Sequence, residues 1–358
     1  MYNFKTISIK ELENLQYKAN FPSNRFEWIN SWYEVFEKVE NNVIGFQKQA
    51  YIVTAYENNQ LVAIIPLVKL IRKFCKCIKL EFVEFLGQQW SCIGHDLIVL
   101  KELDSSFIKQ LLSWIKKNIR YHFIFFKYVP KKSILTKDFK MYRYSGAPMI
   151  CISDYKDYNE FAEKVYAKKF RKKLDRTLRK IEKDGFRLSL SYEEINSSNF
   201  ETIKRISKSK MLDGKSFVYD DVNKEKFHKS LYSKFPSHVM FAKFNDYPVA
   251  YVANIDCDNA RIAIDCAFDR DYRIYGVGVQ CMDCNIRKSF SLNKEKYSFG
   301  VGMDVYKFQF TKTAMPFYMC FGLQNRLKSF LAKPFVLYRA KKSDIKAKQE
   351  FEGVEEYI

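Results

Sequence analysis

Two segments of the chain, 51–71 and 239–255, show the same pattern of a strand, a tight turn and a second strand. The turns are Asn58-Asn59 and Asn245-Asp246, and both residue types tolerate the positive φ that a two-residue hairpin turn requires. The two segments also align without a gap: Ala55, Asn58, Val62 and Ala63 recur as Ala242, Asn245, Val249 and Ala250. This repetition predicts two copies of one α/β unit.

Length and composition support two domains. The chain has 358 residues, and 47% of them are hydrophobic. This length exceeds the roughly 250 to 300 residues at which a single core stops growing. Around each hairpin the periodicity predicts helices and further strands, hence an α/β (α+β) fold in which each unit has a mixed, mostly antiparallel sheet flanked by helices. Ser145-Gly146-Ala147-Pro148 interrupts the pattern, so we expect domains at 1–150 and 151–345, followed by a charged tail at 346–358.

The charge balance indicates an anionic partner. Lys and Arg number 61 against 41 Asp and Glu, a formal net charge of +20. Nucleic acid, anionic lipid, phosphorylated sugars and coenzyme A would all be attracted. The longest apolar run, 61–71, is interrupted by Pro66 and Lys69 and is shorter than the ~18 residues of a membrane span. No secretory signal is visible at the start, so we expect a cytoplasmic protein with reduced cysteines.

The sharpest motif is Arg273-Ile274-Tyr275-Gly276-Val277-Gly278, which follows a predicted strand and precedes a predicted helix. Its two glycines let the backbone approach an anion closely, and the first N–H groups of the helix have no intrahelical acceptor. The order RxxGxG therefore suits a pyrophosphate. The alternative is an ordinary glycine-rich turn.

A strongly basic helix is predicted from Lys168, within 166–184. Its apolar residues Phe170, Leu174, Leu178 and Ile181 recur at helical spacing, and Gly185 suits the end of the helix. Cationic side chains occupy the other positions: Arg171, Lys172, Arg176, Arg179, Lys180 and Lys183. Such a run is commonly a solvated surface, but arginines at this density can also bind phosphate groups.

The order helix, hairpin, strand, RxxGxG, helix, strand resembles the GNAT acyltransferases. From Phe21 to Tyr338 the chain is similar to double-unit proteins typified by the CelD group of cellulose-biosynthesis acetyltransferases, which resemble the Fem-type peptidyl transferases. The features behind this likeness are the helix around Trp28 and Trp32, Pro66-Leu67, Phe85-Leu86-Gly87, His95-Asp96-Leu97, the basic helix before Gly185, and the segment 300–310. The resemblance implies two tandem GNAT-like units. The first lacks RxxGxG and would shape a cleft, the second would bind the acyl donor, and the active site would lie where they meet.

The resemblance also implies roles for individual residues. In GNAT proteins the motif binds the coenzyme A pyrophosphate, which here implies Arg273, Gly276, Val277 and Gly278. Lys307 would contact phosphate, and Tyr306 would protonate the departing thiolate. The basic helix would clamp a phosphorylated acceptor or donor through some of Arg171, Arg176 and Arg179, and the resemblance does not say which.

The general base is left open between two positions. Asp265 lies on the strand before the motif and is either the base or a structural carboxylate. Strand alternation predicts that it shares a face with Ala263 and Ala267. His95 and Asp96 offer a rival base in the first unit.

Metal and covalent chemistry are not expected. Cys281 and Cys284 have CxxC spacing but lie inside a predicted helix, Cys75 and Cys77 have no second pair, and no GxSxG signature is present. The leading hypothesis is an acetyl-CoA-dependent N- or O-acyltransferase with a sugar or polysaccharide-precursor acceptor of the cell envelope.

Two alternatives remain. A Fem-like enzyme would take its group from aminoacyl-tRNA, which the net charge favours and the intact RxxGxG disfavours, so nucleic acid is not the expected partner. A non-catalytic protein could instead contact an anionic membrane through the basic helix.

Overall fold

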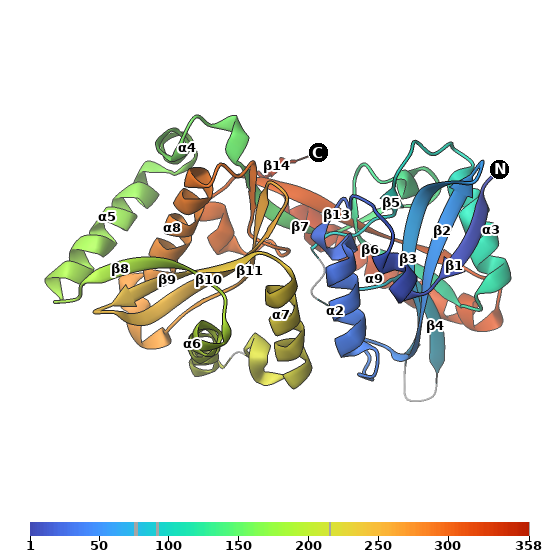
Figure 1. The fold of residues 1–358 in the computed structure, drawn as a ribbon, viewed down its shortest axis with the longest axis horizontal. Coiled ribbons are helices and arrows are strands. Elements are labelled where there is room, and N and C mark those ends of the chain that lie inside the picture. Colours follow the sequence, from blue (N-terminus) through green and yellow to red (C-terminus); the bar gives the residue numbers. More distant parts are fainter. Residues whose placement is uncertain (75–77, 91–92, 215, 358) are drawn as a thin grey trace. The chain divides into compact units, whose positions relative to one another are not determined.

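The computed structural model describes residues 1–74, 78–90, 93–214 and 216–357, so the pair Cys75 and Cys77 lies outside the described residues. The chain divides into two compact units (Figure 1). Unit 1 comprises 1–146 and 315–358, and unit 2 comprises 147–314.

Unit 1 is a mixed sheet in the strand order β1, β2, β3, β4, β6, β13, β7. The pair β4 and β6 is parallel, whereas β1 with β2, β2 with β3, β3 with β4, and β6 with β13 are antiparallel. The short β5 (Ile98–Val99) pairs with β3, and β14 (Glu355–Glu356) pairs with β13. The other strands are β1 (Asn3–Ile7), β2 (Phe46–Glu57), β3 (Gln60–Lys73), β4 (Lys79–Phe85), β6 (Phe123–Pro130), β7 (Tyr142–Cys151) and β13 (Thr313–Leu323); the helices are α1 (Ile9–Glu13), α2 (Phe26–Phe36), α3 (Phe107–Asn118) and α9 (Leu327–Glu350).

Unit 2 repeats the arrangement in the strand order β7, β12, β11, β10, β9, β8, with the second half of β7 at its edge. Only β11 and β12 run parallel among the paired strands described for this unit. Helices α4, α5 and α8 lie on one side of the sheet, and α6 and α7 lie on the other (Figure 1). The strands are β8 (Leu188–Glu194), β9 (Ser237–Phe244), β10 (Tyr247–Cys257), β11 (Ala260–Phe268) and β12 (Lys296–Ser298); the helices are α4 (Tyr158–Val165), α5 (Lys168–Lys183), α6 (Ser197–Lys208), α7 (Val222–Lys234) and α8 (Val277–Ser291).

Both predicted hairpins are present. Asn58 and Asn59 join β2 to β3 with φ of +49° and +63°, and Asn245 and Asp246 join β9 to β10 with φ of +48° and +68°. Each pair adopts the left-handed backbone that matches the twist of the adjoining strands. The fold class predicted from the sequence is confirmed: each unit has a mixed, mostly antiparallel sheet flanked by helices.

The last part of the chain belongs to unit 1, although the sequence pattern grouped residues up to 345 with the second half. β13 pairs with β6 over Phe317–Leu323, which brings the segment back to the first sheet. The segment 346–358 is not a separate tail, since α9 runs to Glu350 and Phe351 is buried. Long-range strand pairing, which has no local sequence signal, decides this arrangement.

One prediction about side-chain direction is wrong. The pairing of β10 with β11 shifts register so that Ala253 pairs with Asp265 and Asn254 pairs with Ala263, which leaves Ile264 as an extra residue. This β-bulge interrupts the alternation of sides along β11. Ala263 therefore packs into the core beneath α8, while Asp265 points to the opposite face, where it contacts Tyr251.

Neither a membrane-spanning helix nor a metal-binding cluster is found among the described residues. No helix among them is long and apolar enough to cross a membrane. Likewise, no group of three or more His, Cys, Asp or Glu side chains in the described ranges could hold a metal ion.

Candidate functional site

The turn between β11 and α8 has the backbone geometry of an anion site. Gly276 adopts a left-handed conformation, with φ of +55°, between the 3₁₀ turn Arg270–Tyr275 and the start of α8. The N–H groups of Val279 and Gln280 donate to the Gly276 carbonyl at 3.0 and 3.3 Å. Those of Val277 and Gly278 come first in the helix, where no intrahelical acceptor exists. The positive end of the helix dipole is centred on these two amides.

Close packing holds this turn in place. A Cβ added to Gly278 would lie 2.9 Å from Cδ1 of Phe268, the last residue of β11. A Cβ on Gly276 would lie 3.6 Å from Oγ1 of Thr177, so the turn also packs beside α5. Gly278 thus allows α8 to begin directly against the strand.

Two arginines on the turn have different surroundings. Arg270 is buried, and its Nε donates to Asp213 Oδ2 at 2.5 Å while its guanidinium lies over the Phe268 ring. Arg273 is exposed; its Nε donates to the Arg270 carbonyl, and its Nη1 lies 4.0 Å from Asp213 Oδ1. Arg270 therefore has a structural role, and the exposed Arg273 lies where it can meet a ligand at the helix end.

Beyond Ile262, β11 continues without β12 as its partner. The two strands pair only from Ala260 to Ile262, whereas β11 runs on to Phe268. The chain that leaves β12 forms a loop held by Lys307. This buried ammonium donates to the carbonyls of Gly300, Val301 and Gly302 at 3.4, 3.2 and 2.9 Å, and burial lowers the pKa of Lys307.

Tyr306 and Cys266 connect this loop to the unpaired part of β11. The Tyr306 hydroxyl lies 3.5 Å from Cys266 Sγ. Desolvation raises the pKa of Tyr306, with a further contribution from Cys266. The phenol is therefore protonated at neutral pH and has a proton to donate.

Both oxygens of Asp265 are engaged on the other face of the sheet. Oδ1 lies 3.3 Å from Nζ of Lys210, and Oδ2 accepts a hydrogen bond from the Tyr251 hydroxyl. The carboxylate side chain is 8% exposed. Lys210 was not recognised from the sequence, because it lies on the 3₁₀ turn after α6 and only the fold brings it to β11.

The rival base in unit 1 is enclosed. His95 is fully buried, its Nε2 is 2.7 Å from the Leu86 carbonyl oxygen, and burial lowers its pKa to about 4. Asp96 accepts hydrogen bonds from the Ser133 hydroxyl and the Leu97 N–H, and burial raises its pKa to about 7. These contacts give the pair a structural role within unit 1.

Helix α5 uses its apolar side for packing. Phe170 and Ile181 are buried in the core of unit 2 and Leu174 packs partly against it, whereas Leu178 is exposed. At 100° per residue, Arg171 and Arg176 lie on opposite flanks of the helix, and Arg179 points away from the core. The three predicted arginines therefore cannot converge on one phosphate.

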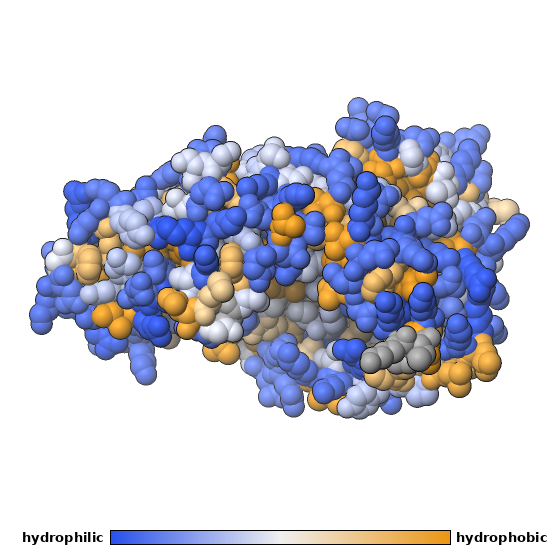
Figure 2. All heavy atoms as spheres, turned by 90° about the horizontal axis from the view of Figure 1, so that it is seen from below, coloured by the Kyte–Doolittle hydropathy of each residue, from blue (hydrophilic) through white to orange (hydrophobic). Residues whose placement is uncertain are grey.

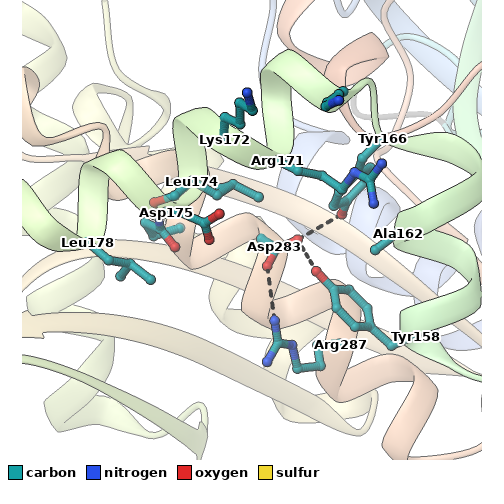
Figure 3. Close-up of a pocket in the computed structure, with 12 residues that line it drawn as sticks. Tyr158, Ala162, Tyr166, Arg171, Lys172, Leu174, Asp175, Leu178, Asp283 and Arg287 are labelled. Atoms are coloured by element: carbon teal, nitrogen blue, oxygen red, sulfur yellow. Dashed lines mark hydrogen bonds and ion pairs between the residues drawn. The ribbon is translucent and has the colours of Figure 1, made fainter.

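Arg171 lines a pocket of about 470 Å³ between α4, α5 and α8 (Figure 3). At its floor Asp283 accepts hydrogen bonds from the hydroxyls of Tyr158 (2.6 Å) and Tyr166 (2.8 Å). The Nη2 atom of Arg287 lies 3.7 Å from Oδ2 of Asp283. Burial raises the pKa of Asp283. The complete lining is Tyr158, Ala162, Tyr166, Lys168, Arg171, Lys172, Leu174, Asp175, Leu178, Gln280, Asp283 and Arg287.

This pocket was not predicted from the sequence. Arg176 and Arg179 are not part of its lining, whereas Asp283 and Arg287 are. The spacing of Gln280, Asp283 and Arg287 places all three on one side of α8 and was an available signal. The four cations of the lining outnumber its two carboxylates, so the pocket favours an anionic group that also offers hydrogen-bond donors.

Comparisons with known proteins identify the type of fold. Residues 168–308 match the family model of the acetyltransferase (GNAT) domain, a segment that contains the turn at Gly276, Asp265 and Tyr306. The chain thus has a GNAT-type fold in its second unit. No curated protein sequence matches it.

Solved structures extend the likeness over both units. A structure of FemX is 10% identical, with a TM-score of 0.58 over 88% of this chain and 96% of that one. A conserved protein of unknown function from Bacteroides thetaiotaomicron is 11% identical, with a TM-score of 0.53 over 90% of this chain and 100% of that one. At these identities the likeness shows the fold alone.

Proposed function

We propose that the protein transfers an acyl group, and specifically acetyl, from acyl-CoA to an amine or hydroxyl of a sugar or polysaccharide precursor used in the cell envelope. The observation that carries this proposal is the start of α8. Two N–H groups without intrahelical acceptors, a left-handed Gly276 and an exposed Arg273 meet there, inside the segment that matches the GNAT model. The CelD-like pathway assignment rests on the sequence resemblance.

The donor pyrophosphate would lie at this helix end. The amides of Val277 and Gly278 would donate to its oxygens, and Arg273 would add a charged contact. Lys307 would contribute to donor binding by positioning the loop at Gly300–Gly302, because its ammonium donates to the carbonyls of that loop. The thioester arm would follow the part of β11 that β12 leaves unpaired.

The reaction requires one nucleophile and two proton transfers. The acceptor nitrogen or oxygen attacks the thioester carbonyl, the carbon–sulfur bond breaks, and the acceptor loses a proton. We assign the removal of that proton to Asp265 and the protonation of the departing thiolate to Tyr306. Coenzyme A and the acylated acceptor are the products.

We assign the phosphorylated part of a substrate to the pocket at Arg171. Arg171, Lys168 and Arg287 can surround a phosphate, and the carboxylates of Asp175 and Asp283 can accept from sugar hydroxyl groups. Arg176 and Arg179, which lie outside the pocket, would raise the local concentration of anionic substrates.

The test is calorimetric titration of the full chain with acetyl-CoA and coenzyme A. We expect micromolar binding that Gly276→Asp abolishes, because the new carboxylate would lie against the pyrophosphate. The circular dichroism spectrum of the variant must match the wild type, so that lost binding is not lost folding. Equal affinity in both proteins, or no wild-type binding, would remove the donor site.

A second candidate is a Fem-like transferase that takes its group from aminoacyl-tRNA. The similarity to FemX in fold, which covers both units, favours it, as does the exposed cationic surface of α5. Retention of tRNA that falls steeply with salt, together with no binding of coenzyme A, would select this candidate over acyl-CoA.

A further inference from the structure

Helix α9 has its large apolar side chains on the outside. Ser329, Ala332, Ala340 and Ala347 are buried along one side, whereas Leu327, Leu331 and Tyr338 on the opposite side are 76, 70 and 61% exposed. A surface helix normally packs its large apolar residues inward. Here the small residues face unit 1, and the stripe that could have formed a core faces solvent.

The stripe is long enough to form a continuous surface. Leu327, Leu331, Tyr338 and Ile345 recur at spacings of four, seven and seven, which keeps them on one side of the helix. Phe330 and Phe335 flank this line and are also exposed, and Phe74 packs against Phe335 with ring centroids 4.4 Å apart. Figure 2 shows several hydrophobic patches among hydrophilic side chains in the right-hand part of its view.

The inward side explains why the helix keeps this orientation. Ala340 and Leu337 pack on Tyr142, Met319 and Phe321 of β7 and β13. Two polar contacts add to this packing: the Ser329 hydroxyl donates to the His122 carbonyl, and Asp344 accepts from the Arg143 N–H. Turning the stripe inward would break these contacts and force large side chains into space that fits alanine.

Cations border the apolar stripe. The helix has seven basic and two acidic residues. Lys346 and Lys348 pair with Glu350 and Asp344. In contrast, no carboxylate among the described residues pairs with the exposed Lys328, Lys333, Lys341 or Lys342. By helical spacing Lys328, Lys341 and Lys342 flank the apolar stripe, whereas Lys333 lies nearer the line of buried residues.

We propose that α9 docks the protein on the surface of an anionic phospholipid bilayer. An apolar stripe that enters the acyl boundary, with lysines at the level of the phosphate groups, is the pattern of a helix that lies in the membrane interface. The lysines identify the partner by charge complementarity, since each gains from a negative lipid surface. Helix α9 belongs to unit 1, whereas α5 and the proposed donor site belong to unit 2, so this proposal does not depend on the catalytic one.

The test is flotation of the full chain with vesicles of phosphatidylglycerol and phosphatidylcholine, compared with phosphatidylcholine alone. We expect binding to the anionic vesicles that weakens as salt is raised. Leu331→Glu should reduce the affinity by about tenfold or more, since it replaces an exposed leucine that would enter the acyl region with a charge that the anionic surface repels. Lys341→Glu should also reduce it, and Leu327→Glu gives an independent second variant of the stripe.

Matched controls are available in the same unit. Val43 is also exposed and apolar, and Lys116 is an exposed lysine on α3, so Val43→Glu and Lys116→Glu change the same properties elsewhere. Both should bind as the wild type does. Equal binding by wild type and Leu331→Glu would overturn the proposal, as would no wild-type binding.

A second copy of the chain is the competing occupant. Light scattering with size exclusion, without vesicles, detects it. A wild-type dimer that Leu331→Glu converts to a monomer would assign the stripe to self-association and overturn the membrane proposal. A monomer in both proteins, together with the expected flotation, supports it.

Discussion

The ring of Phe268 lies against Gly278 so closely that a Cβ at position 278 would come within 2.9 Å of Phe268 Cδ1. The last residue of β11 therefore determines how near the first turn of α8 can approach the strand. The donor site proposed here depends on this approach, because the free amides belong to that turn.

Gly278→Ala tests this packing. The added methyl group should push α8 away from Phe268, lower the free energy of unfolding by about 1–3 kcal/mol, and weaken coenzyme A binding. Phe268→Leu in the same chain should restore both by making room. Urea unfolding measures the stability and calorimetry measures the coenzyme A affinity. If Gly278→Ala alone has the stability and affinity of the wild type, the contact with Phe268 does not control the approach of α8.

Tyr306→Phe tests the proton donor. It removes the hydroxyl near Cys266 Sγ and keeps the ring. We expect kcat to fall by about 10² or more with little change in coenzyme A affinity, since only a proton transfer is lost. The single-turnover rate with acetyl-CoA measures it, and an unchanged rate would assign the proton to another group.

Asp265→Asn separates a base from a structural carboxylate. A base predicts loss of activity with only a modest loss of stability. A structural role predicts a large loss of stability with activity retained in the folded protein, because the variant disturbs the contacts to Lys210 and Tyr251. Lys210→Met is the matched control, as it breaks the ion pair but keeps the carboxylate.

Arg171→Ala tests the pocket, with Arg179→Ala as the control on the same helix. We expect the first to raise KM about tenfold for the substrate whose phosphate the pocket holds, since a charge-assisted contact is lost. The second should change KM less than twofold, in line with a screened surface charge. Equal effects of the two variants would mean that α5 acts only through its overall charge.

Asp96 predicts a pH dependence of stability. Burial raises its folded pKa from 3.8 to about 7, so between these values the folded state binds a proton more tightly than the unfolded state. Stability from this group is full below pH ~4 and falls as pH rises towards ~7, by about 4 kcal/mol at most. Asp96→Asn, which keeps the shape, should lack this decrease in urea unfolding measured across the range. If the free energy of unfolding changed with pH in the same way in both proteins, Asp96 would not be the source of the dependence.

Local features of the chain predicted a large part of the fold. The turns at Asn58-Asn59 and Asn245-Asp246, the basic helix α5 and the start of α8 after Gly276 follow from φ preferences and periodicity within a few residues. The same signals indicated an anion site at the turn. These features depend on neighbours in the sequence, so one sequence is enough to find them.

The tertiary structure decided what depends on distant partners. The bulge at Ile264 turned Asp265 to the face opposite Ala263, and pairing with β6 returned β13 to the first unit. Three helices had to meet before Arg171 and Asp283 could line one pocket. On α9 the periodicity shows an apolar stripe but does not show which side of the helix packs on the sheet. The side with small residues faces β7 and β13, because only small side chains fit there. The sequence by itself determined the local conformations, whereas the fit between surfaces far apart in the chain decided which side chains face each other.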